Sequence, residues 1–128
     1  MTSPVTSFRE LRVYREACDL DYQVFVDSKA FPREEMFSLT DQVRRSSRSI
    51  GANLAEAWAK RRYRAHFVSK LTDADAELQE TRHWVDRAAA YGYLEAARRA
   101  SLEERCDRIG GMLGNMIQHP ESFIQGSQ

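Results

Sequence analysis

The side chains best able to do chemistry in this chain are basic, and they gather in one stretch between Gln42 and Leu71. The stretch contains a single acid, Glu56, and eight basic residues: Arg44, Arg45, Arg48, Lys60, Arg61, Arg62, Arg64 and Lys70. Its net charge is +7, so the rest of this neutral chain carries −7. Clustered lysines and arginines attract phosphate groups without a sequence-specific contact. Two interpretations follow: a solvated helix end balanced by acids elsewhere, or an RNA-binding surface whose phosphate contacts are Arg44, Arg48, Lys60, Arg61, Arg62 and Arg64.

A second polar pattern crosses the same stretch at steps of three and four residues, which places it on one face of an α-helix. Its members are Gln42, Arg45, Ser49, Asn53 and Glu56. A possible partner stripe follows further along the chain, made of Lys70, Asp73, Glu77, Glu80 and Trp84. If the two helices are antiparallel, Arg45 lies near Glu77 or Glu80. The same arrangement brings Glu56 near Lys70.

Paired charges of this kind add little net stability when buried, but they penalise wrong registers and stoichiometries. We therefore expect the stripe to be structural, either inside the bundle or between subunits. A ligand or RNA contact is the alternative.

Patterns for catalysis or metal binding are weak. Glu80-Thr81-Arg82-His83 matches the Glu-x-x-His element of di-iron bundles, but such sites need two of these elements and two further inward glutamates. The chain has only this one, and Cys18 and Cys106 are isolated in the sequence. No glycine-rich phosphate loop or Ser-His-Asp pattern has supporting context. We therefore expect no enzymatic activity, no cofactor and no metal site.

Four helical segments must position these residues, at about 8–28, 33–62, 65–91 and 95–118. Apolar residues recur in them at helical spacing, and no segment alternates convincingly with period two. The apolar stripe of the second segment begins at Met36. The third segment has the cleanest heptad, and Gly92 is expected just past its end, where a left-handed backbone favours glycine. The heptad consists of Phe67, Leu71, Ala74, Leu78, Thr81, Val85 and Ala88.

Short connections between helices make sequential neighbours antiparallel, so we predict an all-α fold, an antiparallel up-down four-helix bundle. Its core should include Leu39, Val43, Ile50, Leu54, Leu71, Leu78, Val85, Ile109 and Leu113.

Length and composition bound the remaining possibilities. At 128 residues the chain is expected to be one domain, 1–128, and 42% hydrophobic with 30% charged residues is a globular composition. No stretch approaches the roughly 18 apolar residues of a transmembrane helix, and the N-terminus lacks the apolar core of a signal peptide. We expect a cytoplasmic protein with reduced cysteines, no membrane contact, and flexible ends such as 126–128.

Residues spread along the chain together resemble a known family. In the first helix they are Phe8, Leu11, Val13-Tyr14, Ala17, Leu20 and Val24; in the second, Phe31-Pro32, Glu35, Leu39, Gln42, Arg44-Arg45, Ser49-Ile50, Asn53 and Ala55-Glu56; later, Glu77-Leu78, Thr81 and Gly92-Tyr93-Leu94. With these the chain resembles the bacterial four-helix bundle family called S23, or 23S rRNA intervening-sequence proteins. The arginine pair through the Ala-Glu pair is the most specific part, and Ala57 departs from the glycine usual in the family.

The resemblance implies a four-helix bundle, a homopentameric barrel and no enzymatic activity. It also implies a connection with RNA, because many members are encoded within inserts in 23S rRNA genes. A related branch comprises the accessory proteins of diversity-generating retroelements. These look like basic pentamers that bind RNA and a reverse transcriptase. By resemblance, the expected partners are further copies of this chain, RNA, and a protein such as a reverse transcriptase.

We predict a non-enzymatic, oligomeric helical-bundle protein that binds structured or ribosomal RNA through a basic surface. The alternative is a protein-interaction scaffold with no nucleic-acid role. The residues themselves also favour assembly, because the first helical segment carries two neighbouring apolar stripes, whereas a helix of a monomeric bundle needs only one. The number five comes only from the resemblance.

Overall fold

The computed structural model of the chain describes residues 5–124 and contains four long helices with three short 3-10 turns. In chain order these are η1 (Phe8–Glu10), α1 (Arg12–Ser28), η2 (Arg33–Glu35), α2 (Leu39–Ala59), α3 (Arg64–Ala90), α4 (Ala96–Gln118) and η3 (Pro120–Ser122). No strand occurs within residues 5–124. The predicted all-α fold is confirmed. The flexibility predicted for 126–128 concerns a segment outside the described residues.

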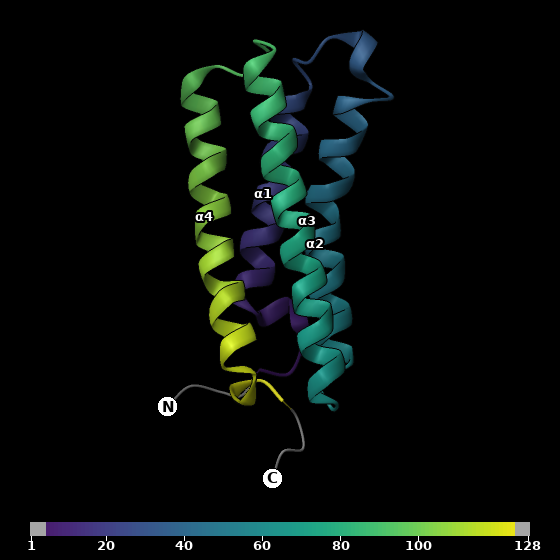
Figure 1. The fold of residues 1–128 in the computed structure, drawn as a ribbon, viewed down its shortest axis with the longest axis vertical. Helices are drawn as coiled ribbons and strands as arrows, with labels where there is room; N and C mark the ends of the chain where they lie inside the picture. The colour runs from purple at the N-terminus through teal and green to yellow at the C-terminus, as the bar shows by residue number, and fades with distance from the viewer. Residues whose placement is uncertain (1–4, 125–128) are drawn as a thin grey trace.

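The four helices run up and down along the long axis of the molecule (Figure 1), and each packs against its two neighbours in a closed ring of contacts. The contact between α2 and α3 is the most extensive. At the start of α1, η1 packs against α2, and beyond α4, η3 packs against α3. The start of α1, the α2–α3 connection and the end of α4 therefore share one end of the bundle, the lower end in Figure 1.

The core lies between the four helices and matches the expected residues. All nine predicted core side chains are at most 5% exposed, and the whole α3 heptad is buried. Helices α1 and α2 lie close together at Gly51, where an added β-carbon would be in ordinary van der Waals contact with the Tyr14 ring, at 3.5 Å. Ser46 of α2 is fully buried, and its Oγ accepts a 2.9 Å hydrogen bond from Thr81 Oγ1 of α3. That bond satisfies two hydroxyls that water cannot reach.

The second helix begins later than predicted. It starts at Leu39, whereas the sequence pattern indicated about 33 and placed Met36 in the apolar stripe. The reason is local: Glu35 Oε1 accepts a 2.6 Å hydrogen bond from Ser38 Oγ, and Glu35 Oε2 accepts one of 2.9 Å from Tyr93 OH. These bonds hold a tight turn ahead of the helix. Met36 is consequently 44% exposed and lies outside the core.

The ends of α2 and α3 differ in how well the sequence indicates them. Helix α2 ends at Ala59 and not at 62, so the predicted basic last turn is a connection of residues 60–63. Gly92 has φ of +81° and follows α3 as predicted. Its N–H donates to Ala89 O at 3.0 Å and the Tyr93 N–H donates to Ala88 O at 2.9 Å. That pair of bonds is a Schellman ending, which requires the left-handed backbone at Gly92.

None of the helices in the described part of the chain combines the length and the apolar character needed to cross a membrane.

Candidate nucleic-acid interface

The connection between α2 and α3 presents the densest group of basic side chains at one end of the bundle. Local hydrogen bonds hold its backbone in a tight turn: the Lys60 N–H donates to Ala57 O and the Tyr63 N–H donates to Lys60 O, both at 3.0 Å. Lys60, Arg62 and Tyr63 are exposed, and so is Arg64, the first residue of α3. We call residues 60–66 the basic end.

Arg61 has a different position from its neighbours. Its guanidinium carbon lies 3.8 Å from the centroid of the Trp58 ring, and Nη1 donates a 2.8 Å hydrogen bond to Trp58 O. Its Nε atom is buried without a hydrogen-bond partner. This cation–π contact closes the end of α2 over the core. Arg61, predicted as an RNA contact, is therefore less available to an external phosphate than the cations beside it.

Lys60 and Arg62 are the most available cations at the basic end. Neither makes an ion pair with another residue within 5–124, whereas Arg64 Nη1 lies 3.7 Å from Glu121 Oε2. Both partners of that pair are more than half exposed, and such surface pairs contribute about 0–1 kcal/mol. A phosphate could therefore compete with Glu121 for Arg64. Three cations within five residues can face one phosphate backbone.

Arg44 and Arg48 lie elsewhere, so the six predicted RNA contacts do not form one cluster. They lie on α2, 16 and 12 residues before Lys60, which directly follows that helix; at 1.5 Å per residue they are about 24 and 18 Å from it along the helix axis. Arg44 Nε donates a 2.8 Å hydrogen bond to Ser28 Oγ, and its guanidinium lies 5.0 Å from the Phe25 ring. Arg44 thus clamps α2 to the end of α1, away from Lys60, and its predicted role as an RNA contact stays a prediction.

Arg48 is exposed on the side of the bundle. It lines a shallow groove of about 330 Å³ on the outer face of α2, together with Asp41, Arg45, Ser49 and Ala52. The groove contains both signs of charge, Asp41 beside Arg45 and Arg48, so it lacks the purely cationic character of the basic end.

The polar stripe of α2 faces α3 and forms ion pairs within the chain. Arg45 Nη1 lies 3.5 Å from Glu77 Oε2, Arg45 Nη2 bonds Glu80 Oε2, and Gln42 Oε1 accepts a hydrogen bond from Arg45 Nε at 3.4 Å. Trp84 Nε1 also donates to Glu80 Oε2, at 3.0 Å. The hydrogen bonds from Trp84 and Arg45 lower the pKa of Glu80. The predicted approach of Arg45 to Glu77 and Glu80 is present in the structure.

The far end of the stripe is held in the same way. Lys70 Nζ lies 2.7 Å from Glu56 Oε2, and this hydrogen bond lowers the pKa of Glu56 and raises the pKa of Lys70. Between the two ion-pair groups, Ser49 Oγ and Asn53 Nδ2 each donate to a backbone carbonyl one turn earlier. The stripe is thus a polar seam along the α2–α3 contact. That it also forms an interface between subunits stays a prediction.

Groups that could support catalysis are few in the described part of the chain. Residues 5–124 contain no group of three or more histidine, cysteine or acidic side chains that could hold a metal ion. His83 is exposed and packs edge-on against Trp84, with 4.8 Å between ring centroids. Burial raises the pKa of the Cys106 thiol to about 12, so this sulfur is protonated at neutral pH and is a poor nucleophile.

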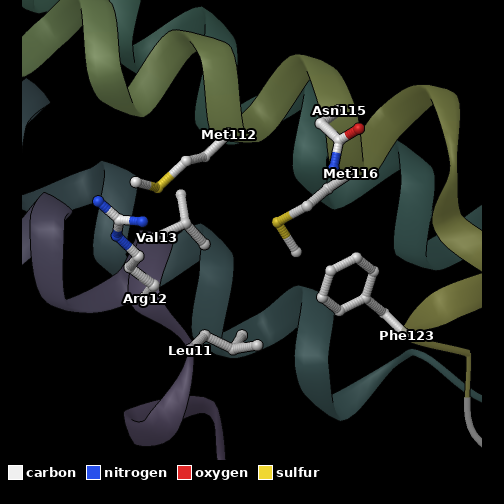
Figure 2. A pocket seen from close by; sticks show the side chains of 7 residues that line it. All are labelled: Leu11, Arg12, Val13, Met112, Asn115, Met116 and Phe123. Atoms are coloured by element: carbon white, nitrogen blue, oxygen red, sulfur yellow. The ribbon is translucent and has the colours of Figure 1, made fainter.

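A small pocket of about 180 Å³ opens between the start of α1 and the end of α4. In Figure 2, side chains from the two helices and from the segment after α4 surround it: Leu11, Arg12, Val13, Met112, Asn115, Met116 and Phe123. The sequence gives little sign of this pocket apart from Met112 and Met116, which are spaced about one helical turn apart. Only Arg12 and Asn115 are polar among its lining residues, and no catalytic group enters it.

Fold and site together define a class: an all-α, up-down four-helix bundle with a dense group of exposed cations at one end. The chain belongs to the 23S rRNA-intervening sequence protein family, whose model matches residues 9–115. The predicted resemblance is thereby confirmed.

A solved structure supports the same assignment. The chain is similar to a protein of unknown function from the S23 ribosomal protein family of Bacteroides thetaiotaomicron, with 25% identity and a TM-score of 0.74. The likeness covers 83% of this chain and 95% of that one. A comparison with curated protein sequences gave no significant match. Neither the family nor the similar structure indicates a class of enzyme.

Proposed function

We propose that this protein is a non-enzymatic, cytoplasmic RNA-binding protein that contacts RNA phosphates with its basic end. The observation that carries the proposal is the exposure of Lys60 and Arg62 without an ion-pair partner among the described residues, next to the loosely held Arg64. Phosphate contacts supply most of non-specific nucleic-acid binding. The basic end therefore needs no base-specific pocket to bind.

The rest of the surface supports this choice by contrast. Several arginines of α3 and α4 already have acidic partners: Arg82 lies 3.2 Å from Glu103, Arg99 lies 2.9 Å from Asp86, and Arg108 lies 3.1 Å from Glu16. These three arginines are therefore balanced within the chain, whereas Lys60 and Arg62 have no ion-pair partner among residues 5–124. The family name, which links such proteins with 23S rRNA, favours structured or ribosomal RNA as the ligand.

The test is fluorescence anisotropy with a labelled hairpin RNA at about 50 mM salt, where phosphate contacts are strong. The variant is Lys60→Glu/Arg62→Glu/Arg64→Glu, and it omits Arg61 because that side chain closes the core over Trp58. A matched control reverses three exposed cations of the opposite end, Lys29, Arg33 and Arg87.

The basic-end variant should lose binding, and the control variant should bind like the wild type, although both change the net charge by the same amount. Equal binding by all three proteins, or no binding by the wild type, would contradict the proposal. Circular dichroism should show the same helix content in all three proteins, because every substituted side chain is exposed.

We further propose that the protein acts as a homo-oligomer. The support is a set of exposed apolar side chains: Phe37 is 94% exposed and Met36 is beside it, and Tyr22 on α1 is 67% exposed. Phe37 lies within the turn that the hydrogen bonds of Glu35 with Ser38 and Tyr93 hold, so an apolar ring is held out in water on an ordered backbone. Such groups are typical of interfaces. A ring of copies would also repeat the basic end.

Light scattering at micromolar concentration tests the assembly. The wild type should be an oligomer, with five copies as the number that the family resemblance implies, and Phe37→Asp should dissociate it. A monomeric wild type would refute the assembly, and a dimer or tetramer would refute only the number.

The same exposed Phe37 favours one second candidate, a protein-interaction scaffold that binds another protein, such as a reverse transcriptase, and no RNA. If the wild type binds no RNA in the anisotropy test, this second candidate becomes the favoured function.

A further inference from the structure

Tyr63 is an exposed aromatic ring at the centre of the basic end. The residue is 58% exposed, and its hydroxyl makes no hydrogen bond with another described residue. Its backbone is fixed on both sides, because its N–H donates to Lys60 O and its carbonyl accepts from the Phe67 N–H, each at 3.0 Å. An apolar ring is therefore held in water by a rigid turn.

Cationic and aromatic groups surround this ring. The Arg62 guanidinium lies 5.9 Å from its centroid, and the His66 ring lies 5.6 Å away at an interplanar angle of 52°. Lys60 and Arg64 flank it in sequence. Basic side chains that follow a nucleic-acid backbone, together with an aromatic face between them, are the combination with which proteins bind single-stranded nucleic acids.

We infer that Tyr63 is a stacking platform for an unpaired base, so that the RNA bound at the basic end is single-stranded at the point of contact. In a duplex each base is already stacked on its neighbours, and its face is closed to a protein ring; in a loop, bulge or strand end the face is open. The inference rests on the proposed RNA-binding function and adds the class of RNA to it.

Tyr91 provides a matched control at the opposite end of the bundle. It is 55% exposed, and the Arg87 guanidinium lies 5.4 Å from its ring. It resembles Tyr63 in exposure and in its arginine neighbour, but it lacks the adjacent Lys60 and Arg64. A general effect of removing an exposed tyrosine would therefore appear at both positions.

The experiment measures the affinity of the full chain for an unstructured 12-nucleotide RNA and for a 12-base-pair duplex of the same sequence. The variants are Tyr63→Ala, Tyr63→Phe and Tyr91→Ala, each measured at several salt concentrations. We expect Tyr63→Ala to weaken single-strand binding roughly five- to hundredfold, the range of one lost base stack. Tyr63→Phe should restore it, and Tyr91→Ala should leave it unchanged.

The salt dependence separates this inference from the proposed function. Stacking releases no counterions, so Tyr63→Ala should keep the wild-type slope of log affinity against log salt concentration while lowering the affinity. Wild-type single-strand affinity in Tyr63→Ala, or duplex binding as tight as single-strand binding, would overturn the inference and leave the RNA-binding proposal in place. No binding of either RNA by the wild type would overturn both.

Discussion

The number of cations free to bind phosphate sets how steeply binding depends on salt. At the basic end these are Lys60, Arg62 and Arg64, because Arg61 is held by Trp58. Three phosphate contacts to a single strand give a slope of log affinity against log salt concentration of about −2, at about −0.7 for each contact. A rise from about 50 to about 200 mM salt should then weaken binding roughly 16-fold per basic end.

The perturbation is Lys60→Gln/Arg62→Gln, which removes two of the three contacts and keeps the side chains polar. Its slope should fall to about a third of the wild-type slope. The ratio of slopes is the useful quantity, because it does not change if several copies in an assembly bind one RNA. The control is Arg33→Gln/Arg87→Gln, two exposed arginines at the opposite end.

The assay is fluorescence anisotropy with the 12-nucleotide RNA at four or more salt concentrations. Equal slopes for the wild type and Lys60→Gln/Arg62→Gln would refute the reasoning, because the phosphates would then lie against other cations. A fall in the slope of the control variant would refute it as well.

Other predictions test the scaffold. Arg45→Glu places a third carboxylate beside Glu77 and Glu80 and, given the partial exposure of these groups, should lower the free energy of unfolding by about 1–2 kcal/mol in thermal denaturation. The swap Arg45→Glu/Glu80→Arg should recover part of this loss. An unchanged melting temperature for the single variant would contradict a stabilising role of the polar seam. Ile50→Asp places an unpaired charge at a fully buried site and should unfold the chain by circular dichroism, whereas Ile50→Val should cost about 1 kcal/mol; a folded Ile50→Asp would be the contrary result. Burial raises the pKa of Asp21, so the folded state holds its proton to higher pH and stability falls as pH rises through that pKa; Asp21→Asn should therefore raise the melting temperature at pH 7 relative to the wild type but not at pH 3, and an equal effect at both would contradict it.

The helices and their core could be predicted because they depend on spacing alone. The α3 heptad is buried at every position, and the antiparallel register that follows from short connections brings Arg45 to Glu80 and Lys70 to Glu56. The start of α2 could not be predicted in this way. It depends on one carboxylate, Glu35, which bonds Ser38 and Tyr93 from a distant part of the chain.

The candidate site was predictable as a stretch of charge but not as a surface. Counting charges cannot show that Arg44 bonds Ser28 or that Arg61 covers Trp58, because both are contacts that only the packed helices create. Hydrophobic patterning likewise does not single out Tyr63 or Phe37 as exposed rings. Their exposure follows from the two tight turns in which they lie.

The most direct test of RNA binding at the basic end is ultraviolet cross-linking followed by cleavage after glutamate and mass spectrometry. Glu56 and Glu77 are consecutive glutamates, so the basic end falls in the peptide 57–77, and Arg44 and Arg48 fall in the preceding peptide 36–56. We expect RNA adducts in 57–77, with Tyr63 as the modified residue. Adducts confined to 36–56, or no adducts from an RNA that saturates the protein, would contradict it.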